Sequence, residues 1–199
     1  MSLFCWNCRG LGNPRAVRCL IELVGLKNPS IVFLCETLLD KSGMERIRRR
    51  LGFRHCFTVE RVGRSGGLAM LWHNATELSL LSYSKNHIDM AIEGLGGCKW
   101  RFTGFYGHPE RCNRRHSWSL LQELAGRESL PWLVCGDFND ILSQEEKLGG
   151  CPQPDWMLQG FNEVVADCGL TEVQMAGGTF TWRRGGVREK LDRGLASAP

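Results

Sequence analysis

The sequence lacks an apolar run long enough to span a membrane, which predicts that no part of it crosses a bilayer. It opens Met1-Ser2-Leu3-Phe4 without a basic stretch or a cleavage pattern, so no signal peptide is expected. Low-complexity tracts and an obvious interdomain linker are also missing. We therefore expect the 199 residues, of which 43% are hydrophobic and 23% charged, to form a single soluble domain with a sizeable core.

Neither the charge nor the cysteine content singles out a special class of protein. The net charge of +4 permits a polyanionic partner but does not require one. The ten cysteines, in a chain without a secretion signal, are interpreted as reduced, small hydrophobic residues. Cys5 and Cys8 form a single CxxC, but residues three apart on a strand face opposite sides and no second pair follows, so zinc binding is disfavoured.

The N-terminal part of the chain has the pattern of a β-α-β unit. Residues 3–8 and 31–36 are typical of strands, and Asn13-Pro14 begins a helix whose apolar residues recur at helical spacing. The two strands should be parallel, with a right-handed connection.

The rest of the chain mixes strands and helices without strict alternation. We expect further strands at residues 56–62, 67–73, 77–83, 87–93, 99–106 and 132–137, a hairpin formed by 178–182 and 187–193, and helices at 42–51, 113–126 and 155–167. This order favours an α/β fold in which two β-sheets pack together and helices lie outside them.

Polar residues stand where several of the apolar strands end. The strand that ends at Gly136 is followed by Asp137 and Asn139, whose side chains should point the same way because they are two residues apart. Asn7 and Glu36 end the first two strands in the same manner. We expect these four side chains to gather at one edge of a sheet, a common position for active sites in α/β folds.

These residue types suit the hydrolysis of a phosphodiester. That reaction needs a divalent cation, a base that activates water and donors that hold the transition state. Glu36 is a candidate ligand for magnesium, and Asp137 is a candidate for activating water. Tyr106, at another strand end, could donate to a phosphate oxygen, and Asp192 is a further carboxylate of the same kind.

Each feature alone has a simpler explanation. A lone glutamate at a strand end is usually a surface residue, and Asp-x-Asn after a strand is often turn chemistry. The basic run Arg46-Ile47-Arg48-Arg49-Arg50 is most often a solvated helix face. Spacing alone therefore leaves both an enzyme and a binding domain open.

A set of motifs in a fixed order resembles the endonuclease/exonuclease/phosphatase superfamily, over essentially the whole chain. More closely, it resembles the endonuclease domain of plant non-LTR (LINE-type) retrotransposons. The motifs are Trp6-Asn7-Cys8-Arg9-Gly10-Leu11-Gly12, Leu34-Cys35-Glu36-Thr37, Ser65-Gly66-Gly67-Leu68-Ala69, Thr103-Gly104-Phe105-Tyr106-Gly107, Gly136-Asp137-Phe138-Asn139 and Arg188-Glu189-Lys190-Leu191-Asp192-Arg193. The resemblance implies a DNase I-like, four-layer α/β sandwich.

The resemblance also implies roles for single residues. Glu36 would bind Mg²⁺, with Mn²⁺ as an alternative ion, and Asn7 would help to hold the metal and the phosphate. Tyr106 would contact the scissile phosphate, and Asp137 with Asn139 would activate water or stabilise the transition state. Asp192 would orient a catalytic histidine. Contacts to DNA are expected from Thr179, with Thr181 as the alternative, and from arginines near the strand ends, namely Arg9, Arg64, Arg111, Arg114 and Arg115.

One departure from the family pattern concerns the final Ser-Asp-His motif. It should follow Asp192, yet the sequence contains only His55, His73, His87, His108 and His116. We therefore expect a single domain that lacks its last strand and has impaired activity, since losing one member of a catalytic unit costs several decades in rate. The alternatives are a non-catalytic nucleic-acid-binding remnant and a phosphatase of the same fold.

The resemblance further implies a DNA partner, no membrane, a monomer and a nuclear location. In an intact element, a reverse transcriptase would lie downstream in the same polypeptide.

Overall fold

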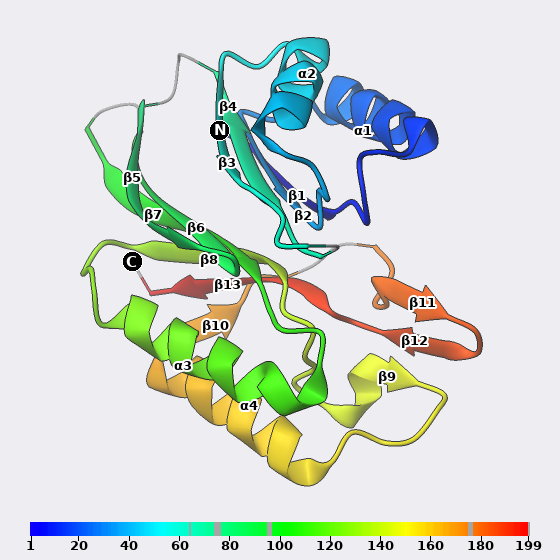
Figure 1. The fold of residues 1–199 in the computed structure, drawn as a ribbon. Helices are drawn as coiled ribbons and strands as arrows, with labels where there is room; N and C mark the ends of the chain where they lie inside the picture. The colour runs from blue at the N-terminus through cyan, green and yellow to red at the C-terminus, as the bar shows by residue number, and fades with distance from the viewer. Residues whose placement is uncertain (64, 74–76, 95–96, 175–176, 199) are drawn as a thin grey trace. The chain divides into compact units, whose positions relative to one another are not determined.

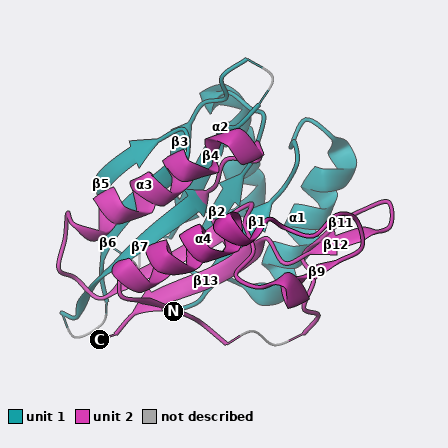
Figure 2. Ribbon diagram, turned by 90° about the horizontal axis from the view of Figure 1, so that it is seen from below, with its two compact units in different colours: residues 1–105 teal, residues 106–199 magenta. Residues whose placement is uncertain are grey.

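The computed structural model describes residues 1–63, 65–73, 77–94, 97–174 and 177–198. The chain divides into two compact units, Met1–Phe105 and Tyr106–Pro199 (Figure 2). No helix in the described ranges is long and apolar enough to cross a membrane.

The first unit contains a four-stranded sheet in the order β1-β2-β4-β3. β1 (Leu3–Asn7) and β2 (Ile31–Cys35) are parallel and are joined by helix α1 (Pro14–Lys27), which confirms the predicted β-α-β unit. β4 (Leu68–Trp72) runs antiparallel to β2 and to β3 (His55–Val59).

The limits of α1 follow from its sequence. Pro14 occupies the first turn, and the Asn13 side chain accepts the Arg15 amide at 2.9 Å. The helix ends at Asn28, whose φ of 43° lies in the left-handed region.

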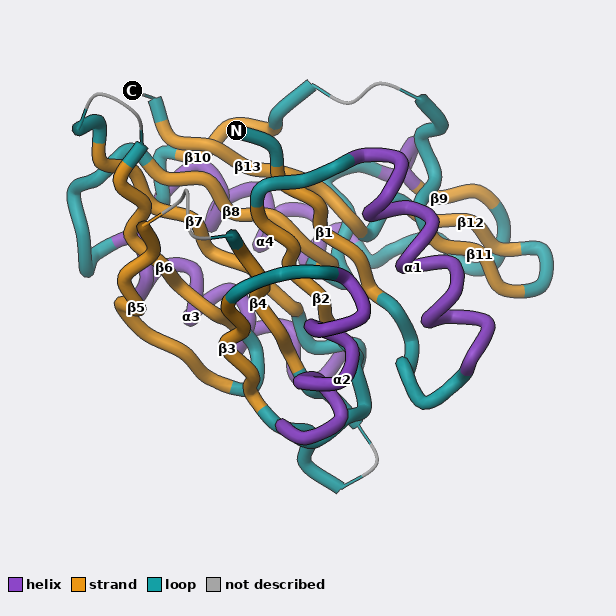
Figure 3. The backbone as a smooth tube through the Cα atoms, turned by 90° about the horizontal axis from the view of Figure 1, so that it is seen from above, coloured by secondary structure: helices purple, strands orange, loops and turns teal. Residues whose placement is uncertain are grey.

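Helices α1 and α2 (Lys41–Leu51) share one apolar core with the strands (Figure 3). α2 begins at Asp40, whose carboxylate accepts the Gly43 amide at 2.7 Å, and ends at Gly52, with φ 77°. Val17 and Leu20 of α1, Met44 and Ile47 of α2, and Leu34 of β2 belong to this core. The strands therefore carry helices on one face.

The same unit contains the antiparallel strands β5 (Glu77–Ser84), β6 (His87–Glu93) and β7 (Lys99–Tyr106). Gly104 of β7 packs directly on Phe33 of β2: a Cβ atom at Gly104 would lie only 2.2 Å from the Phe33 ring. Two sheets thus meet face to face, and glycine permits the close approach.

The second unit contains its own strands and two helices. β13 (Asp192–Ser197) lies between β8 (Trp132–Asp137) and β10 (Leu170–Glu172) and is antiparallel to both. Helices α3 (Arg114–Ala125) and α4 (Asp155–Asp167) pack on each other beside these strands (Figure 1), with Trp118, Leu121, Met157 and Phe161 buried. Short 3₁₀ turns at Arg111–Asn113 and Gln144–Glu146 complete the unit.

The end of the chain differs from the expected hairpin of 178–182 and 187–193. The hairpin is formed instead by β11 (Trp182–Arg184) and β12 (Val187–Glu189), and β12 also pairs with β9 (Lys147–Leu148). Asp192 belongs to the separate strand β13, because the chain leaves β12 to pair with β8. The sequence analysis also missed the short strands β9 and β10, whereas the other expected segments agree with the structure except near their ends.

Candidate active site

The first unit places Asn7 and Glu36 at the same edge of its four-stranded sheet. In the parallel pair β1–β2, Asn7 lies opposite Cys35, so Glu36 follows directly beside it. The Asn7 Oδ1 atom accepts the Arg9 amide at 3.1 Å, and the Gly10 amide donates to the Glu36 carbonyl at 2.7 Å. The loop after β1 and the loop after β2 are therefore joined by a hydrogen bond close to Asn7 and Glu36.

Backbone strain is concentrated at this edge. Arg9, Glu36 and Leu38 have φ values of 47°, 52° and 54°, which residues other than glycine seldom adopt. Such conformations persist only where neighbouring structure enforces them, and they often occur at functional sites.

The Ser65-Gly66-Gly67 motif supplies part of that enforcement. The amides of Thr37 and Leu38 donate to the Gly67 and Gly66 carbonyls at 3.0 and 3.1 Å. A Cβ atom at Gly67 would lie 2.5 Å from the Thr37 hydroxyl, so only glycine fits there. The motif thus shapes the loop that carries Glu36.

The second unit brings Tyr106, Asp137 and Asn139 together. The Asp137 Oδ1 atom accepts the Asn139 amide at 2.9 Å, and the Asn139 side chain, on a residue with φ 54°, donates to the Gly107 carbonyl at 2.9 Å. The Gly107 amide donates to the Asp137 carbonyl at 2.8 Å, which places the neighbouring Tyr106 beside them. All three side chains are buried or nearly so.

Asp192 lies directly opposite Asp137 in the β8–β13 pair. The Phe138 amide donates to the Leu191 carbonyl at 2.9 Å, so Asp137 and Asp192 form the adjacent pair without backbone hydrogen bonds between them. In standard antiparallel geometry, the Cβ atoms of such a pair are about 4.5–5.5 Å apart on one face. Two carboxylates, an amide and a phenol thus share one strand end.

The two candidate DNA-contacting threonines have different surroundings. The Thr181 hydroxyl accepts the amides of Leu191 and Asp192, both at 3.0 Å, and so holds the start of β13. Thr179 is exposed. Thr181 is exposed as well, and this geometry gives it a structural role.

The candidate DNA-binding arginines also differ. Arg9 and Arg115 are exposed, and the Arg115 guanidinium lies 5.3 Å from the centre of the Trp156 ring. The Arg114 side chain is only 11% exposed and forms an ion pair with Asp140 at 3.3 Å. Burial lowers the pKa of Arg114, against the effect of Asp140. Arg111 lies in the turn before α3, and Arg64 lies outside the described residues.

Asp140 anchors the loop after Asn139, a role that the sequence analysis missed. Its carboxylate accepts the Trp118 indole N–H at 2.9 Å and a Gln153 side-chain N–H at 3.4 Å. Burial raises the pKa of Asp140, although Arg114 and Trp118 oppose the shift. The loop is thereby fixed to helix α3 and to the segment before α4.

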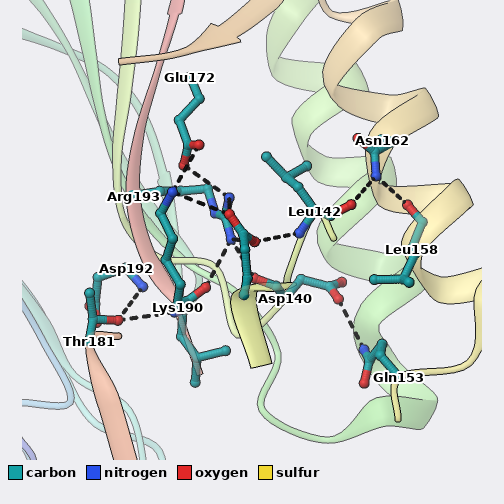
Figure 4. A network of polar contacts seen from close by, with 12 residues as sticks. Asp140, Leu142, Gln153, Leu158, Asn162, Glu172, Thr181, Lys190, Asp192 and Arg193 are labelled. Carbon is teal, nitrogen blue, oxygen red and sulfur yellow. Dashed lines mark hydrogen bonds and ion pairs between the residues drawn. The ribbon is translucent and has the colours of Figure 1, made fainter. Parts of the chain in front are cut away.

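Arg193 is the second missed residue and has the larger network (Figure 4). Its fully buried side chain donates to Glu146 at 2.7 Å, to Glu172 at 3.0 Å, and to the carbonyls of Asp140 and Lys190 at 3.1 and 2.9 Å. Strand alternation directs Arg193 to the face opposite Asp192, where it lies over Phe161. Arg193 thus connects β13 to the segment that follows Asn139.

Glu146 is held in its charged form by this network. Burial works against ionisation, but hydrogen bonds from Arg193 and the Leu142 amide outweigh it, so the pKa of Glu146 is lowered. A carboxylate with a lowered folded pKa stabilises the fold above its ordinary pKa. That stabilisation is lost as the pH falls through the folded value.

The donors at the first unit's sheet edge fit a hard cation. Glu36 offers a carboxylate and Asn7 an amide oxygen, and Mg²⁺ typically binds one or two carboxylates while keeping several waters. Within the part of the chain that the structure describes, no three His, Cys, Asp or Glu side chains form a metal-binding group. The set is therefore compatible with magnesium held largely by water.

A family model decides the assignment. The model of the endonuclease/exonuclease/phosphatase family matches residues 4–198. The chain belongs to this family. A search of curated protein sequences gave no match.

Solved structures agree with this membership. The chain resembles NExo, a 3′ phosphatase from Neisseria solved with a product DNA hairpin (TM-score 0.71, 19% identity, covering 99% of this chain and 86% of that one). It also resembles an AP endonuclease from Archaeoglobus fulgidus (TM-score 0.71, 15% identity, covering 99% of this chain and 86% of that one). A third similar structure is the endonuclease domain of TRAS1, a telomere-specific non-LTR retrotransposon (TM-score 0.68, 13% identity, covering 98% of this chain and 84% of that one). These likenesses confirm the predicted four-layer α/β sandwich, with two mixed sheets flanked by helices.

Replacing Arg193 should destabilise this family member strongly. Arg193→Met removes the fully buried cation beside Glu146 and Glu172 and leaves them only Lys190, at 3.2 and 2.9 Å. Breaking a buried pair costs up to about 3–5 kcal/mol. Urea denaturation at pH 7 measures the loss. The difference from the unmodified protein should shrink at acidic pH, as Glu146 becomes protonated.

Arg127→Met is the matched control, because the Arg127–Glu123 pair is exposed. It should change stability by less than about 0.5 kcal/mol. Equal effects of the two substitutions would contradict the role assigned to Arg193.

The two threonines can be separated by parallel substitutions. Thr181→Val removes the acceptor for two amides and should cost about 1 kcal/mol in the free energy of unfolding. Thr179→Val, at an exposed position, should stay within about 0.5 kcal/mol. Thermal unfolding measures both, and a larger loss for Thr179→Val would reverse the assignment.

Proposed function

We propose that the chain is a magnesium-dependent DNA endonuclease domain of the plant non-LTR (LINE-type) retrotransposon kind, which nicks target DNA by phosphodiester hydrolysis. One observation carries the proposal: Asp137 and Asp192 lie side by side with Asn139 and Tyr106 at one strand end, in a member of a family of phosphoesterases. This combination can activate water and hold a phosphate.

The proposed roles of the four residues come from the family resemblance, and the contacts of Asp137 and Asn139 support them. Asp137 accepts the proton of the attacking water, because its carboxylate is fixed by the Asn139 amide. The Asn139 side-chain nitrogen donates a hydrogen bond to the Gly107 carbonyl. The second N–H and the oxygen of the same amide group remain to bind water or phosphate. Tyr106 donates its phenol hydroxyl to a phosphate oxygen. Asp192 would orient a catalytic histidine.

Glu36 and Asn7 are the residues that would hold Mg²⁺ or Mn²⁺. The ion would neutralise phosphate charge and stabilise the leaving oxygen. Glu36 would thus supply the metal for the reaction in which Asp137 activates water.

DNA is the proposed partner for a further reason, the β11–β12 hairpin. Arg183 and Arg188 lie directly opposite each other on its two strands, and both are exposed. In the described part of the chain they have no ion pair, and like charges placed opposite each other destabilise a hairpin. A polyanion such as DNA would relieve that repulsion.

The resemblance to retroelement domains supplies the remaining parts of the proposal. They are a monomer, a nuclear location and a reverse transcriptase downstream in the same polypeptide of an intact element. The motifs Trp6–Gly12 and Arg188–Arg193 favour this reading over a phosphatase of the same fold. A non-catalytic nucleic-acid-binding domain is the alternative.

Plasmid nicking tests the proposal. The 199-residue polypeptide should nick supercoiled DNA slowly in millimolar Mg²⁺ and not in EDTA. A version extended by the Ser-Asp-His strand of a close relative should be faster by several decades. In that version, Asp137→Ala or Glu36→Ala should lower the rate by at least about 10²-fold.

Asp167→Ala is the control for the loss of one carboxylate, since Asp167 is exposed at the end of α4. Its nicking rate should be unchanged. Nicking that survives Asp137→Ala would exclude the assigned site, whereas DNA binding without nicking in the extended version would favour the non-catalytic alternative. Release of phosphate from phosphate monoesters without nicking would favour the phosphatase.

A further inference from the structure

The positive charge of the chain is concentrated in one short segment of the first unit. Residues 41–54 contain six lysines and arginines and only one acidic residue, Glu45, which gives a net charge of +5. The whole chain carries +4, so all the other residues together carry −1. The mild overall charge therefore hides one strongly basic surface.

Helix α2 sorts this segment into a buried and an exposed face. Gly43, Met44 and Ile47 are buried against the sheet. Arg46, Arg49 and Arg50 are exposed and lie at positions i, i+3 and i+4, which places them on one side of the helix. The exposed Arg54 follows just after the helix. We call these four arginines the α2 basic face.

In the described part of the chain, none of the four arginines of the α2 basic face forms an ion pair, although Arg46 interacts electrostatically with Asp40. The one ion pair on this helix joins Arg48 to Glu45. Like charges at i, i+3 and i+4 destabilise a helix. The helix dipole favours cations in the last turn, where Arg49 and Arg50 lie, so helix stability favours part of the arrangement. It does not account for Arg46, which precedes the last turn, or for Arg54, which follows the helix.

The C-terminal end of α2 lies at the edge of the first unit's sheet opposite to Glu36. β2 runs toward the sheet edge that carries Glu36, and β3 runs in the same direction because both are antiparallel to β4. β3 starts at His55, just after α2, so the helix must return to the opposite edge (Figures 1 and 3). The helix rises about 1.5 Å per residue, so Arg50 lies about 14 Å along the axis from Lys41.

We infer that the α2 basic face is a second DNA-binding surface, which holds the phosphate backbone of duplex DNA away from the segment that is cut. The inference rests on the proposed function for its ligand. Duplex DNA carries one charge per about 1.7 Å, so exposed guanidinium groups gain most from counterion release on it. Contacts of this kind are to phosphates and are therefore independent of base sequence.

Salt-dependent DNA binding tests the inference. Binding of a labelled 40-base-pair duplex to the 199-residue chain is measured by fluorescence anisotropy in EDTA, across a range of KCl concentrations. The triple variant Arg46→Gln, Arg49→Gln, Arg50→Gln should lower the slope of log K against log salt by about 2–3, since each phosphate contact contributes about 0.9. The triple lysine variant at the same positions should keep most of the slope.

The matched control removes the same charge elsewhere in the first unit. Lys27→Gln, Lys85→Gln, Lys99→Gln neutralises three exposed lysines, and its slope should fall by less than 1. Equal slopes for the two triple variants would overturn the inference. Circular dichroism should show an unchanged or higher melting temperature for the arginine variant, since a repulsion is removed.

A footprint locates the contact directly. Modification of arginine by phenylglyoxal, mapped by mass spectrometry, should slow at Arg46, Arg49 and Arg50 when duplex DNA is in excess. Unchanged modification there would overturn the inference, as would tighter binding of single-stranded RNA than of duplex DNA through the same three residues. These outcomes are independent of nicking: a loss of nicking in Asp137→Ala with an unchanged slope separates the α2 basic face from the active site.

Discussion

The antiparallel pairing of β8 with β13 is the constraint on which the candidate site of the second unit depends. It brings Asp137 and Asp192, which are far apart in the sequence, into directly opposed positions. The hydrogen bond from Phe138 to Leu191 sets the register. A shift of β13 by one residue would turn Asp192 to the other face of the sheet, away from Asp137. Arg193 and Thr181 both act on this pairing, from the buried face and from the start of β13.

Much of the first unit could be predicted from the sequence, because its signals are local. Asn13-Pro14 marks the start of α1, and the apolar residues of α1 and β2 recur at the spacing of a helix and of a buried strand. The prediction that Asn7, Glu36, Asp137 and Asn139 form a site rests on an equally local signal, because each lies at or just after the end of an apolar strand.

The remaining features depend on contacts between distant segments, which the sequence pattern does not encode. In the sequence, Arg193 is one more charged residue near a predicted hairpin. Only the fold shows that it forms ion pairs with Glu146 and Glu172. β13 was merged with that hairpin because nothing local marks the change of partner at Asp192. The sequence pattern of Arg46, Arg49 and Arg50 indicates a solvated face, and the structure adds that none of the three forms an ion pair among the described residues.

The central proposal is that Asn7 and Glu36, in the first unit, and Asp137, Asn139 and Asp192, in the second, take part in the same metal-dependent reaction. Paramagnetic broadening of backbone amide NMR signals by Mn²⁺ tests it most directly, because the effect depends on distance from the bound ion. At low Mn²⁺ concentration, the account predicts broadening around residues 7 and 36 and also around residues 137–139 and 192, and its loss in Glu36→Gln. Broadening confined to one of the two units, or unchanged by Glu36→Gln, would contradict the claim.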